Sequence, residues 1–186
     1  RRGVAATVVV EKMVGSLAEA GGSLEECKKL GDKVNKNSGS MGVALTSCSV
    51  PAAGKPNFEI GDDEMEFGVG IHGEPGRRRD KIKSAQEITS ELLEAINEDL
   101  KPEKNEEILL FVNGMGGTPL TELYLIFDNA KNVLDKKNIK ISRSLVGNYC
   151  TSLEMQGASI TLTKLDEELV KHWDSSVLTA AMRWGM

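Results

Sequence analysis

EMEFGVGIHGEPG, the sequence of residues 64–76, passes from a strand pattern to a turn pattern. Its first half alternates, and alternation with period two predicts a β-strand over residues 64–71. The apolar side of that strand is made by Met65, Phe67, Val69 and Ile71. Gly-Glu-Pro-Gly then ends the strand in a turn. His72 stands at that end between Gly70 and Gly73, whose missing side chains leave room for a small molecule to reach the imidazole. We therefore predict a site at His72, with Gly70, Gly73 and Glu74 as the residues on its substrate side.

Helix and strand patterns alternate on both sides of this segment. Helices are predicted over residues 4–20, 23–37, 84–100, 119–137 and 166–173, and the second of them starts with a capping box of Ser23 and Glu26. Further strands are predicted over residues 41–48, 107–113, 139–146 and 157–163, and the apolar run Leu109–Val112 suggests burial on both faces. Residues 38–40 and 51–56 are predicted as loops, and Trp184 is expected to dock the C-terminal tail. This order predicts an α/β fold in a single domain, residues 1–186.

A glycine-rich loop, NGMGGTP at residues 113–119, joins a predicted strand to a predicted helix. Such loops bind phosphate where their N–H groups meet a helix N-terminus. Thr118 as the cap and Pro119 at the first helical position fit a helix start. The loop lacks the Gly-Lys-Ser/Thr ending of a P-loop, so we predict no nucleotide site there. Two interpretations stay open, namely tight packing around a helix cap and a contact with a ligand.

Four other polar groups have a structural interpretation beside a functional one. Lys55 is either a phosphate contact or a solvated loop lysine. Arg77–Arg79 either meet a partner's phosphate or an acidic surface, or form a solvated loop. Glu74 either orients the His72 imidazole or is a turn carboxylate. His172 has no nucleophile, carboxylate pair or glycine pocket near it in the sequence, so we predict a structural histidine.

Charge and cysteine content narrow the class of protein. The chain has 186 residues, a formal net charge of −5 and 40% hydrophobic residues. These values are typical of a soluble globular domain and argue against a surface that binds nucleic acid or anionic membranes. No apolar run reaches the ~20 residues of a membrane span. The three cysteines, Cys27, Cys48 and Cys150, are odd in number and lack the spacing of metal ligands, so we expect thiols, no metal site and a cytoplasmic location.

Several segments taken together resemble the substrate-binding (DhaK-type) subunit of the dihydroxyacetone kinase family. They are, in chain order, RRGVA (1–5), MGVAL (41–45), VPAAGKP (50–56), FGVGIHGEPG (67–76), TPLTELY (118–124) and YCTSLEM (149–155). A series of matches in order is far more specific than one glycine-rich string. The resemblance implies a two-layer α/β domain with a mixed sheet, the second domain of that subunit. The chain is thus expected to be the C-terminal part of the subunit, with the family's catalytic aspartate in the preceding half.

The resemblance also implies a covalent role for His72. In the family, the histidine of this segment adds to the ketone of dihydroxyacetone and holds it as a hemiaminal for phosphoryl transfer, which gives dihydroxyacetone phosphate. A neutral imidazole, with a free pKa of ~6.5, is a usable nucleophile near pH 7. Covalent capture selects a carbonyl compound over glycerol, whereas selection by size separates such analogues by only about 1–3 kcal/mol.

Partners and cofactors are likewise implied by the resemblance. No cofactor is expected on this chain, and ADP or ATP with Mg is expected on a nucleotide-carrying (DhaL-type) subunit or domain. The ending Trp184-Gly185-Met186 resembles subunits of the phosphotransferase-system type, which use phosphoenolpyruvate, more than the ATP-dependent type. A homodimer is expected in the full subunit, without nucleic-acid or membrane partners, and the isolated chain is expected to be inactive. The alternative is a non-catalytic paralogue that binds dihydroxyacetone and acts as a regulator or coactivator.

Overall fold

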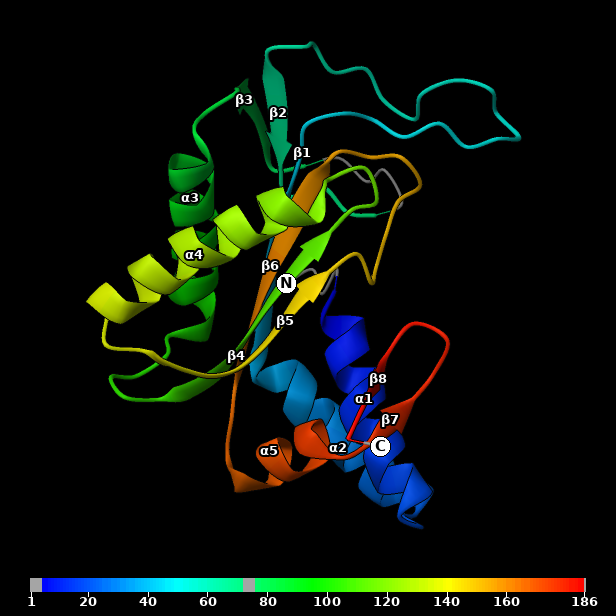
Figure 1. The fold of residues 1–186 in the computed structure, drawn as a ribbon, viewed down its shortest axis with the longest axis vertical. Coiled ribbons are helices and arrows are strands. Elements are labelled where there is room, and N and C mark those ends of the chain that lie inside the picture. Colours follow the sequence, from blue (N-terminus) through cyan, green and yellow to red (C-terminus); the bar gives the residue numbers. More distant parts are fainter. Residues whose placement is uncertain (1–4, 72–75, 186) are drawn as a thin grey trace.

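A computed structural model describes residues 5–71 and 76–185, which form a mixed α/β fold (Figure 1). Its helices are α1 (Ala6–Glu19), α2 (Leu24–Lys36), α3 (Ala85–Leu100), α4 (Leu120–Lys136) and α5 (Glu167–Asp174). A six-stranded sheet has the order β3-β2-β1-β6-β4-β5 and contains β1 (Ser38–Ala44), β2 (Glu64–Phe67), β3 (Arg78–Lys81), β4 (Glu107–Gly114), β5 (Lys140–Gly147) and β6 (Gly157–Lys164). Strands β4 and β5 pair in parallel and the other neighbours are antiparallel. The predicted α/β class with a mixed sheet is confirmed.

Helices cover both faces of the sheet, α3 and α4 on one side and α1, α2 and α5 on the other (Figure 1). On β4, Ile108, Leu110 and Val112 belong to the apolar cluster beneath α3 and α4. The residues between them, Leu109 and Phe111, belong to the cluster beneath α1, α2 and α5. Successive side chains of a strand point to opposite faces, so an uninterrupted apolar run serves both clusters. The burial of Leu109–Val112 on both faces is confirmed, and the domain has three layers, one more than the two expected.

Serine side chains fix the start of α2 and of α3. The hydroxyl of Ser23 accepts the N–H of Glu26 at 3.3 Å, and the Glu26 carboxylate accepts the backbone N–H of Ser23 at 2.8 Å. This capping box satisfies N–H groups that a helix start leaves unpaired. The capping box predicted from the sequence is therefore confirmed, and Ser84 and Glu87 form a second one at α3.

Strand β1 begins at Ser38, although residues 38–40 were predicted as a loop. The hydroxyl groups of Ser38 and Thr163 lie 2.8 Å apart, and those of Ser40 and Thr161 lie 2.6 Å apart. Hydroxyl pairs across neighbouring strands stabilise a sheet. The loop prediction was wrong because the small polar residues hydrogen-bond across the sheet to β6 and not to solvent.

Strand β2 ends at Phe67, earlier than the predicted strand over residues 64–71. Gly68 has a φ of +76°, a left-handed conformation that breaks the extended path and favours glycine. Its N–H donates to the carbonyl of Gly42 at 2.7 Å. The chain after Gly68 therefore leaves the sheet before it reaches His72.

Arg78–Lys81 form the edge strand β3, where a solvated arginine loop was one of the expectations. The Arg78 guanidinium lies 4.6 Å from the centre of the Phe67 ring, its partner across the strands. Arg79 stands opposite Glu66 and donates to it at 2.8 Å. Oppositely charged and cation–aromatic pairs across strands hold this polar segment in the sheet.

The C-terminal tail forms a small hairpin of β7 (Val177–Leu178) and β8 (Arg183–Trp184). The rings of Trp184 and Trp173 meet edge to face with centroids 5.4 Å apart, so the predicted docking of the tail by Trp184 is confirmed. His172 on α5 is buried, and its Nδ1 lies 3.0 Å from the Ser16 hydroxyl, as expected for a structural histidine. None of the helices in residues 5–71 and 76–185 combines the length and the hydropathy of a membrane span.

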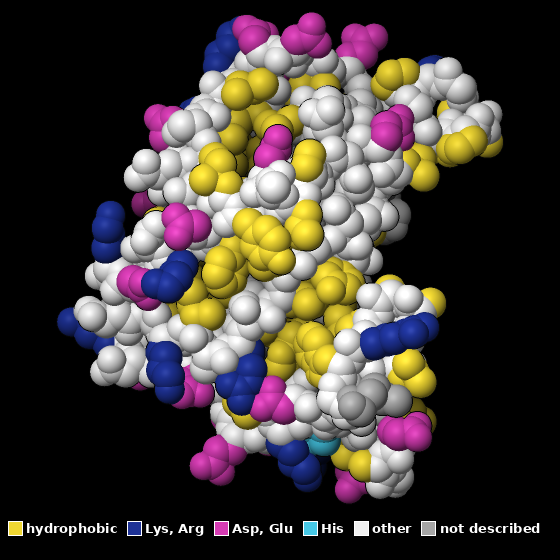
Figure 2. All heavy atoms as spheres, viewed as in Figure 1, with side chains coloured by type: hydrophobic (Ala, Val, Ile, Leu, Met, Phe, Trp, Pro, Cys, Tyr) yellow, Lys and Arg dark blue, Asp and Glu magenta, His cyan; other side chains and the backbone are white. Residues whose placement is uncertain are grey.

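Apolar side chains gather on the face of the molecule shown in Figure 2, over α4 and below it. On α4 itself Leu120, Tyr124 and Leu125 are about half exposed. The opposite stripe of the helix, with Leu123, Ala130 and Leu134, is buried against the sheet. Helix α4 therefore has an apolar stripe on its outer side as well as on its inner side.

Candidate functional site

The loops around the predicted site meet beyond one end of the sheet. Strands β1, β4 and β5 finish there and β6 begins there. We call this region the site end and define it as residues 45–63, 68–71, 76–77, 114–119 and 148–156. The long loop after β1 and the loop between β5 and β6 lie together in it, at the upper right of Figure 1. Ligands of open α/β sheets bind outside the carboxyl ends of the strands.

Of the predicted site residues, His72, Gly73 and Glu74 lie outside the described residues. Gly70 is described and is buried. Ile71, the last described residue before His72, accepts a hydrogen bond on its carbonyl oxygen from the Ser152 hydroxyl at 2.6 Å. The structure therefore places the loop of residues 148–156 against the chain that leads into His72.

Ser152 joins three parts of the site end. Besides its bond to Ile71, its backbone N–H donates to the carbonyl of Met115 at 2.7 Å. Its hydroxyl also lies 3.3 Å from the Cys48 sulfur. The residue is only 6% exposed. One serine thus connects the loop after β1, the loop after β4 and the chain before His72.

Glu66 holds the chain on the far side of His72. Its Oε1 accepts the N–H of Gly76 at 2.8 Å, and its Oε2 accepts a hydrogen bond from Arg79 at 2.8 Å. Partial burial by itself would raise the pKa of Glu66, but the hydrogen bonds from Arg79 and Gly76 and the charge of Arg79 outweigh it and lower that pKa. The carboxylate is therefore ionised near neutral pH, as an acceptor for two donors requires.

A small apolar cluster lies beneath these contacts. It consists of Ala44, Cys48, Val69, Met115 and Met155, with Phe58 packed against it. The cluster brings together residues from four segments of the site end or its border. Apolar packing thus supports the polar contacts of the site end from below.

The glycine-rich loop after β4 uses its N–H groups within the protein. Gly116 donates to Asn148 Oδ1 at 3.1 Å, and Gly117 donates to the carbonyl of Met155 at 2.9 Å. A side chain at either glycine would overlap the backbone of Leu153 or Glu154. The observed contacts match the tight-packing interpretation of this loop, since an anion would need these N–H groups to be available.

Thr118 has a different role from the predicted helix cap. Its hydroxyl donates to the carbonyl of Gly157 at 2.7 Å and accepts the N–H of Gly157 at 2.8 Å. Pro119 occupies the cap position of α4, without a hydrogen bond from its side chain. The cap prediction was wrong because the start of β6 competes for the threonine hydroxyl.

Asn113 at the end of β4 fixes the path of the loop that carries Ser152. Its Oδ1 accepts the N–H groups of Tyr149 at 3.0 Å and Cys150 at 2.8 Å, and its Nδ2 donates to the Cys150 carbonyl at 2.8 Å. The residue is fully buried. A buried amide with three partners is costly to replace, because each backbone group would lose its bond.

Two further charged residues lie in the site end, and only the first of them was considered in the sequence. Lys55 is exposed in the loop after β1, so its contact with a phosphate stays a prediction. Glu154 accepts the N–H of Ser49 at 2.7 Å. Hydrogen bonds from its own backbone N–H and from Ser49 lower the pKa of the Glu154 carboxyl.

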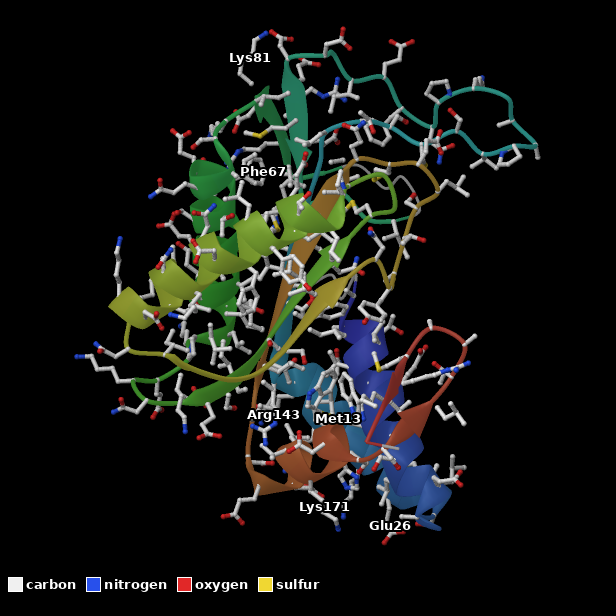
Figure 3. The ribbon with its side chains drawn as sticks, in the orientation of Figure 1. Met13, Glu26, Phe67, Lys81, Arg143 and Lys171 are labelled. Atoms are coloured by element: carbon white, nitrogen blue, oxygen red, sulfur yellow. The ribbon has the colours of Figure 1, made fainter. Side chains whose placement is uncertain are left out.

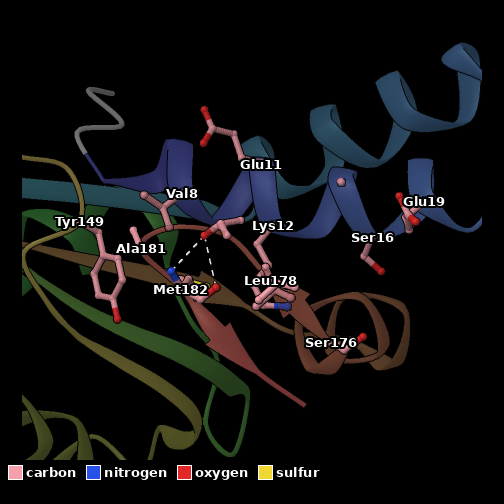
Figure 4. A pocket seen from close by; sticks show the side chains of 13 residues that line it. Val8, Glu11, Lys12, Ser16, Glu19, Tyr149, Ser176, Leu178, Ala181 and Met182 are labelled. Atoms are coloured by element: carbon pink, nitrogen blue, oxygen red, sulfur yellow. Dashed lines mark hydrogen bonds between the residues drawn. The ribbon is translucent and has the colours of Figure 1, made fainter. Parts of the chain in front are cut away.

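A cavity of about 600 Å³ lies between α1 and the β7–β8 hairpin. In the close view of Figure 4, Tyr149 lies at one end of it and Glu19 at the other. Lys12 lines the cavity, but its ammonium donates to the carbonyl of Ser175 at 2.7 Å and lies 4.8 Å from the centre of the Trp184 ring. Burial lowers the pKa of Lys12. This lysine is thus part of the packing between α1 and the tail.

The cavity meets the site end at Tyr149 and extends from there along α1 to Glu19. Figure 3 shows Phe67 and Lys81 beside β2 and β3, whereas Met13 and Lys171 lie with α1 and α5. Within the described residues, no three His, Cys, Asp or Glu side chains come together as a metal-ion site. All three cysteines lie in the described part of the chain, and each is a thiol.

The family of the chain follows from a profile of the Dak1 domain, which matches residues 1–181. The chain belongs to the Dak1 domain family. One relative is the PTS-dependent dihydroxyacetone kinase 1, dihydroxyacetone-binding subunit DhaK, of Listeria innocua serovar 6a. It is 48% identical over 168 residues, which cover 90% of this chain and 51% of the relative. The resemblance noted in the sequence is therefore confirmed at the level of the family.

Other members of the Dak1 domain family differ in their names and lengths. The human triokinase/FMN cyclase is 41% identical over 186 residues, which cover 97% of this chain and 32% of that protein. Among solved structures, a dihydroxyacetone kinase operon co-activator, Dha-DhaQ, superposes with a TM-score of 0.87 at 32% identity, over 94% of this chain and 55% of the other. This Dak1 chain spans about half the length of its Listeria relative.

The sequence predicted a site at His72 but assigned no role to the residues that bond to its neighbours Ile71 and Gly76. Ser152 lies in the motif YCTSLEM and Glu66 on the polar side of the predicted strand, and neither was assigned a role. The alternation of polar and apolar residues around Phe67 could have shown that Glu66 lies on the opposite face of the strand from Met65 and Phe67. No sequence signal predicts the contact between Ser152 and Ile71, which are 81 residues apart.

Proposed function

We propose that the protein to which this chain belongs captures dihydroxyacetone on His72 as a covalent hemiaminal. The captured ketone is then held for phosphoryl transfer that gives dihydroxyacetone phosphate. The observation that carries the proposal is the segment FGVGIHGEPG in a chain that is 48% identical over 168 residues to a dihydroxyacetone-binding subunit. The hydrogen bonds at Ile71 and Gly76, one on each side of His72, support it, because a covalent site needs its nucleophile held in place.

The capture step balances without an added reactant. The lone pair of the unprotonated ring nitrogen forms a bond to the ketone carbon, and the π electrons of the carbonyl move to its oxygen. That oxygen takes up the proton that the other ring nitrogen releases. The reverse step returns the intact ketone, so capture is reversible. Glycerol has no carbonyl carbon and cannot react in this way.

The residues around His72 have defined parts in this proposal. Gly70 and Gly73 leave the space in which the ketone approaches the ring. Glu74 orients the imidazole through one ring nitrogen, which leaves the other free to attack. The captured molecule keeps its hydroxyl groups, and one of them attacks the phosphoryl group in line. Phosphoryl transfer depends mainly on such positioning.

The phosphoryl donor lies on a partner in this proposal. A DhaL-type subunit carries the nucleotide with Mg, and phosphoenolpyruvate renews it through the phosphotransferase system in the cytoplasm. The name of the Listeria relative, which is PTS-dependent, supports this type of donor, and an ATP-dependent type is the competitor. Full-length protein supplied with each donor system in turn distinguishes the two, since only the correct donor gives dihydroxyacetone phosphate. In this proposal the full subunit is a homodimer, and residues 1–186 form one of its domains.

A second candidate function is a regulator that binds dihydroxyacetone without phosphorylating it. The superposition on an operon co-activator, with a TM-score of 0.87, favours it as the alternative. The two candidates share ketone capture and differ in turnover. A full-length protein that captures the ketone but yields no phosphorylated product with either donor system would be the regulator.

Calorimetric titration of the full-length protein with dihydroxyacetone and with glycerol tests the proposal. We expect the ketone to bind and glycerol to give no heat of binding. His72→Ala should weaken ketone binding by more than about 100-fold, since the covalent bond is lost, while the melting temperature stays unchanged. Tight, ketone-selective binding by His72→Ala would overturn the covalent role.

A further inference from the structure

We propose that Ser152 and Glu66 are positioning residues for the capture of the ketone, because they hold the two ends of the segment that carries His72. The inference rests on the function proposed above. It adds two residues from different parts of the chain that act on His72 through its neighbours in sequence. Neither residue needs to touch the substrate.

At the first end, Ser152 fixes the peptide group that enters His72. The carbonyl oxygen of Ile71, which accepts the Ser152 hydroxyl at 2.6 Å, belongs to the same planar unit as the nitrogen of His72. Fixing that oxygen therefore fixes the plane from which the His72 backbone starts. The bond is buried with Ser152, so water does not readily replace it.

Ser152 is itself held in place by its surroundings. Its N–H donates to Met115, and its carbonyl accepts the N–H of Met155 at 3.0 Å. The next residue, Leu153, has a φ of +52°, which is unusual for leucine. Its carbonyl packs against Gly116, where any side chain would overlap it. A conformation of this kind persists only where its surroundings fix it, and such conformations are frequent at functional sites.

At the second end, Glu66 fixes the peptide group that leaves the segment. Its carboxylate accepts the N–H of Gly76 at 2.8 Å and is held from the other side by Arg79. Arg77 adds a backbone bond to the carbonyl of Phe67 at 2.6 Å. The first residues after the segment are thereby tied to the end of β2. Partial burial raises the pKa of the Glu66 carboxyl, but the hydrogen bonds from Arg79 and Gly76 and the charge of Arg79 lower it by more.

The two anchors leave four residues, 72–75, between fixed points. Ile71 and Gly76 are the described residues nearest to His72 on each side, and each shares a hydrogen bond with one anchor. Misplacement of a reacting group by about 1 Å can cost a factor of roughly 100 in rate. We therefore expect loss of either anchor to weaken capture without removing the nucleophile.

The test compares Ser152→Ala and Glu66→Ala with matched controls in the full-length protein. Ser38→Ala removes another buried hydroxyl, which donates to the carbonyl of Val34 at 2.8 Å at the opposite end of β1. Glu106→Ala removes another carboxylate that accepts a backbone N–H at 2.7 Å and an ion pair, here with Lys164 at 3.0 Å. Glu66→Gln is the conservative variant, because its amide oxygen can still accept the N–H of Gly76.

Two measurements are made on each variant. Titration with dihydroxyacetone measures the half-capture concentration, at which half of the protein carries captured ketone. This concentration should be roughly 10- to 100-fold higher for Ser152→Ala and Glu66→Ala than for wild type. The two controls and Glu66→Gln should stay within about threefold of wild type. Capture at saturating ketone should remain complete, because His72 is still present. Hydrogen exchange without ligand should be at least about tenfold faster at the Gly76 amide in Glu66→Ala than in Glu106→Ala.

The outcomes separate this inference from the proposed function. Equal half-capture concentrations for the two anchor variants and their controls would overturn the inference, even if wild type captures the ketone. An unchanged exchange rate at Gly76 in Glu66→Ala would also overturn it. If wild type captures no ketone at all, the proposed function fails and the positioning role fails with it. Exchange at Gly76 then still reports whether Glu66 holds the segment.

Discussion

The site end and the helical layer of α1, α2 and α5 are held together in different ways. In the helical layer, Met13, Leu30, Val34 and Trp173 share one apolar cluster with Leu109 and Phe111 of the sheet. Each residue makes many small contacts with its apolar neighbours, so no single atom of the cluster holds a whole segment. At the site end and its border, single polar side chains hold whole loops, namely the amide of Asn113 at the end of β4 and the hydroxyl groups of Thr118 and Ser152.

This difference shows that two kinds of contact stabilise one domain, namely apolar packing in the helical layer and single buried hydrogen bonds at the site end. Apolar packing is non-directional and spreads its contribution over many contacts. A buried hydrogen bond depends on one donor and one acceptor, and removing either leaves the other unsatisfied. Loss of one buried polar group or one closely packed glycine at the site end should therefore cost far more than a substitution at an exposed position of a helix.

The largest contrast should come from the same substitution at two glycines. Gly116→Ala should lower the free energy of unfolding by more than about 4 kcal/mol, because φ is +121° and the new methyl group would overlap the Leu153 carbonyl. Gly15→Ala on α1 should raise it by about 0.5–1 kcal/mol, since the methyl group would meet no atom within 4 Å and alanine favours the helix. Urea unfolding of both variants measures this. Equal destabilisation by the two would show that the regions do not differ as described.

A smaller contrast should come from two asparagines. Asn113→Ala should lower the free energy of unfolding by about 3 kcal/mol, because three buried backbone partners lose their bonds. Asn132→Ala removes an exposed bond to Asp128 on α4 and should cost less than about 0.5 kcal/mol. Thermal unfolding followed by circular dichroism compares them. An Asn113→Ala variant as stable as Asn132→Ala would contradict the importance assigned to the buried amide.

The smallest effect concerns the titration of His172 in the helical layer. Burial, and then the charges of Lys171 and Lys33, lower the pKa of His172 below 6.5, while Glu168 opposes them. Above pH 6.5 both the folded and the unfolded chain carry a neutral ring, so the histidine makes no pH-dependent contribution. As the pH falls below 6.5 the unfolded chain binds the proton first, and stability decreases by at most about 1.4 kcal/mol per pH unit.

His172→Gln should remove that part of the acid sensitivity. Unfolding free energies of wild type and variant between pH 5 and pH 8 measure the difference. We expect the two curves to run parallel above pH 6.5 and to diverge below it, with wild type falling more steeply. Parallel curves over the whole range would mean that burial does not affect the His172 pKa.

The sequence predicted the elements with strong local signals. The capping box at Ser23 and the apolar run Leu109–Val112 depend on neighbours in the chain, and both are confirmed. The segment around His72 was found in the same way, from its own pattern and its resemblance to a family. Local patterns thus predicted the α/β class, which is confirmed, whereas the site at His72 stays a prediction.

The parts that could not be predicted depend on partners far away in the chain. Arg78–Lys81 form a strand because Phe67, Glu66 and Glu64 stand opposite them on β2, which local propensity does not reveal. Thr118 hydrogen-bonds Gly157 and not its own helix, although its local sequence fits a cap. The anchor Ser152 was missed for the same reason, since it comes from a loop 81 residues away from Ile71.

The most direct test of the account is a crystal structure of the full-length protein with dihydroxyacetone. The account predicts continuous electron density from a His72 ring nitrogen to a tetrahedral carbon of the ligand, with Ser152 bonded to Ile71. A planar ketone separated from His72 by a van der Waals gap, or a ligand bound elsewhere, would contradict it.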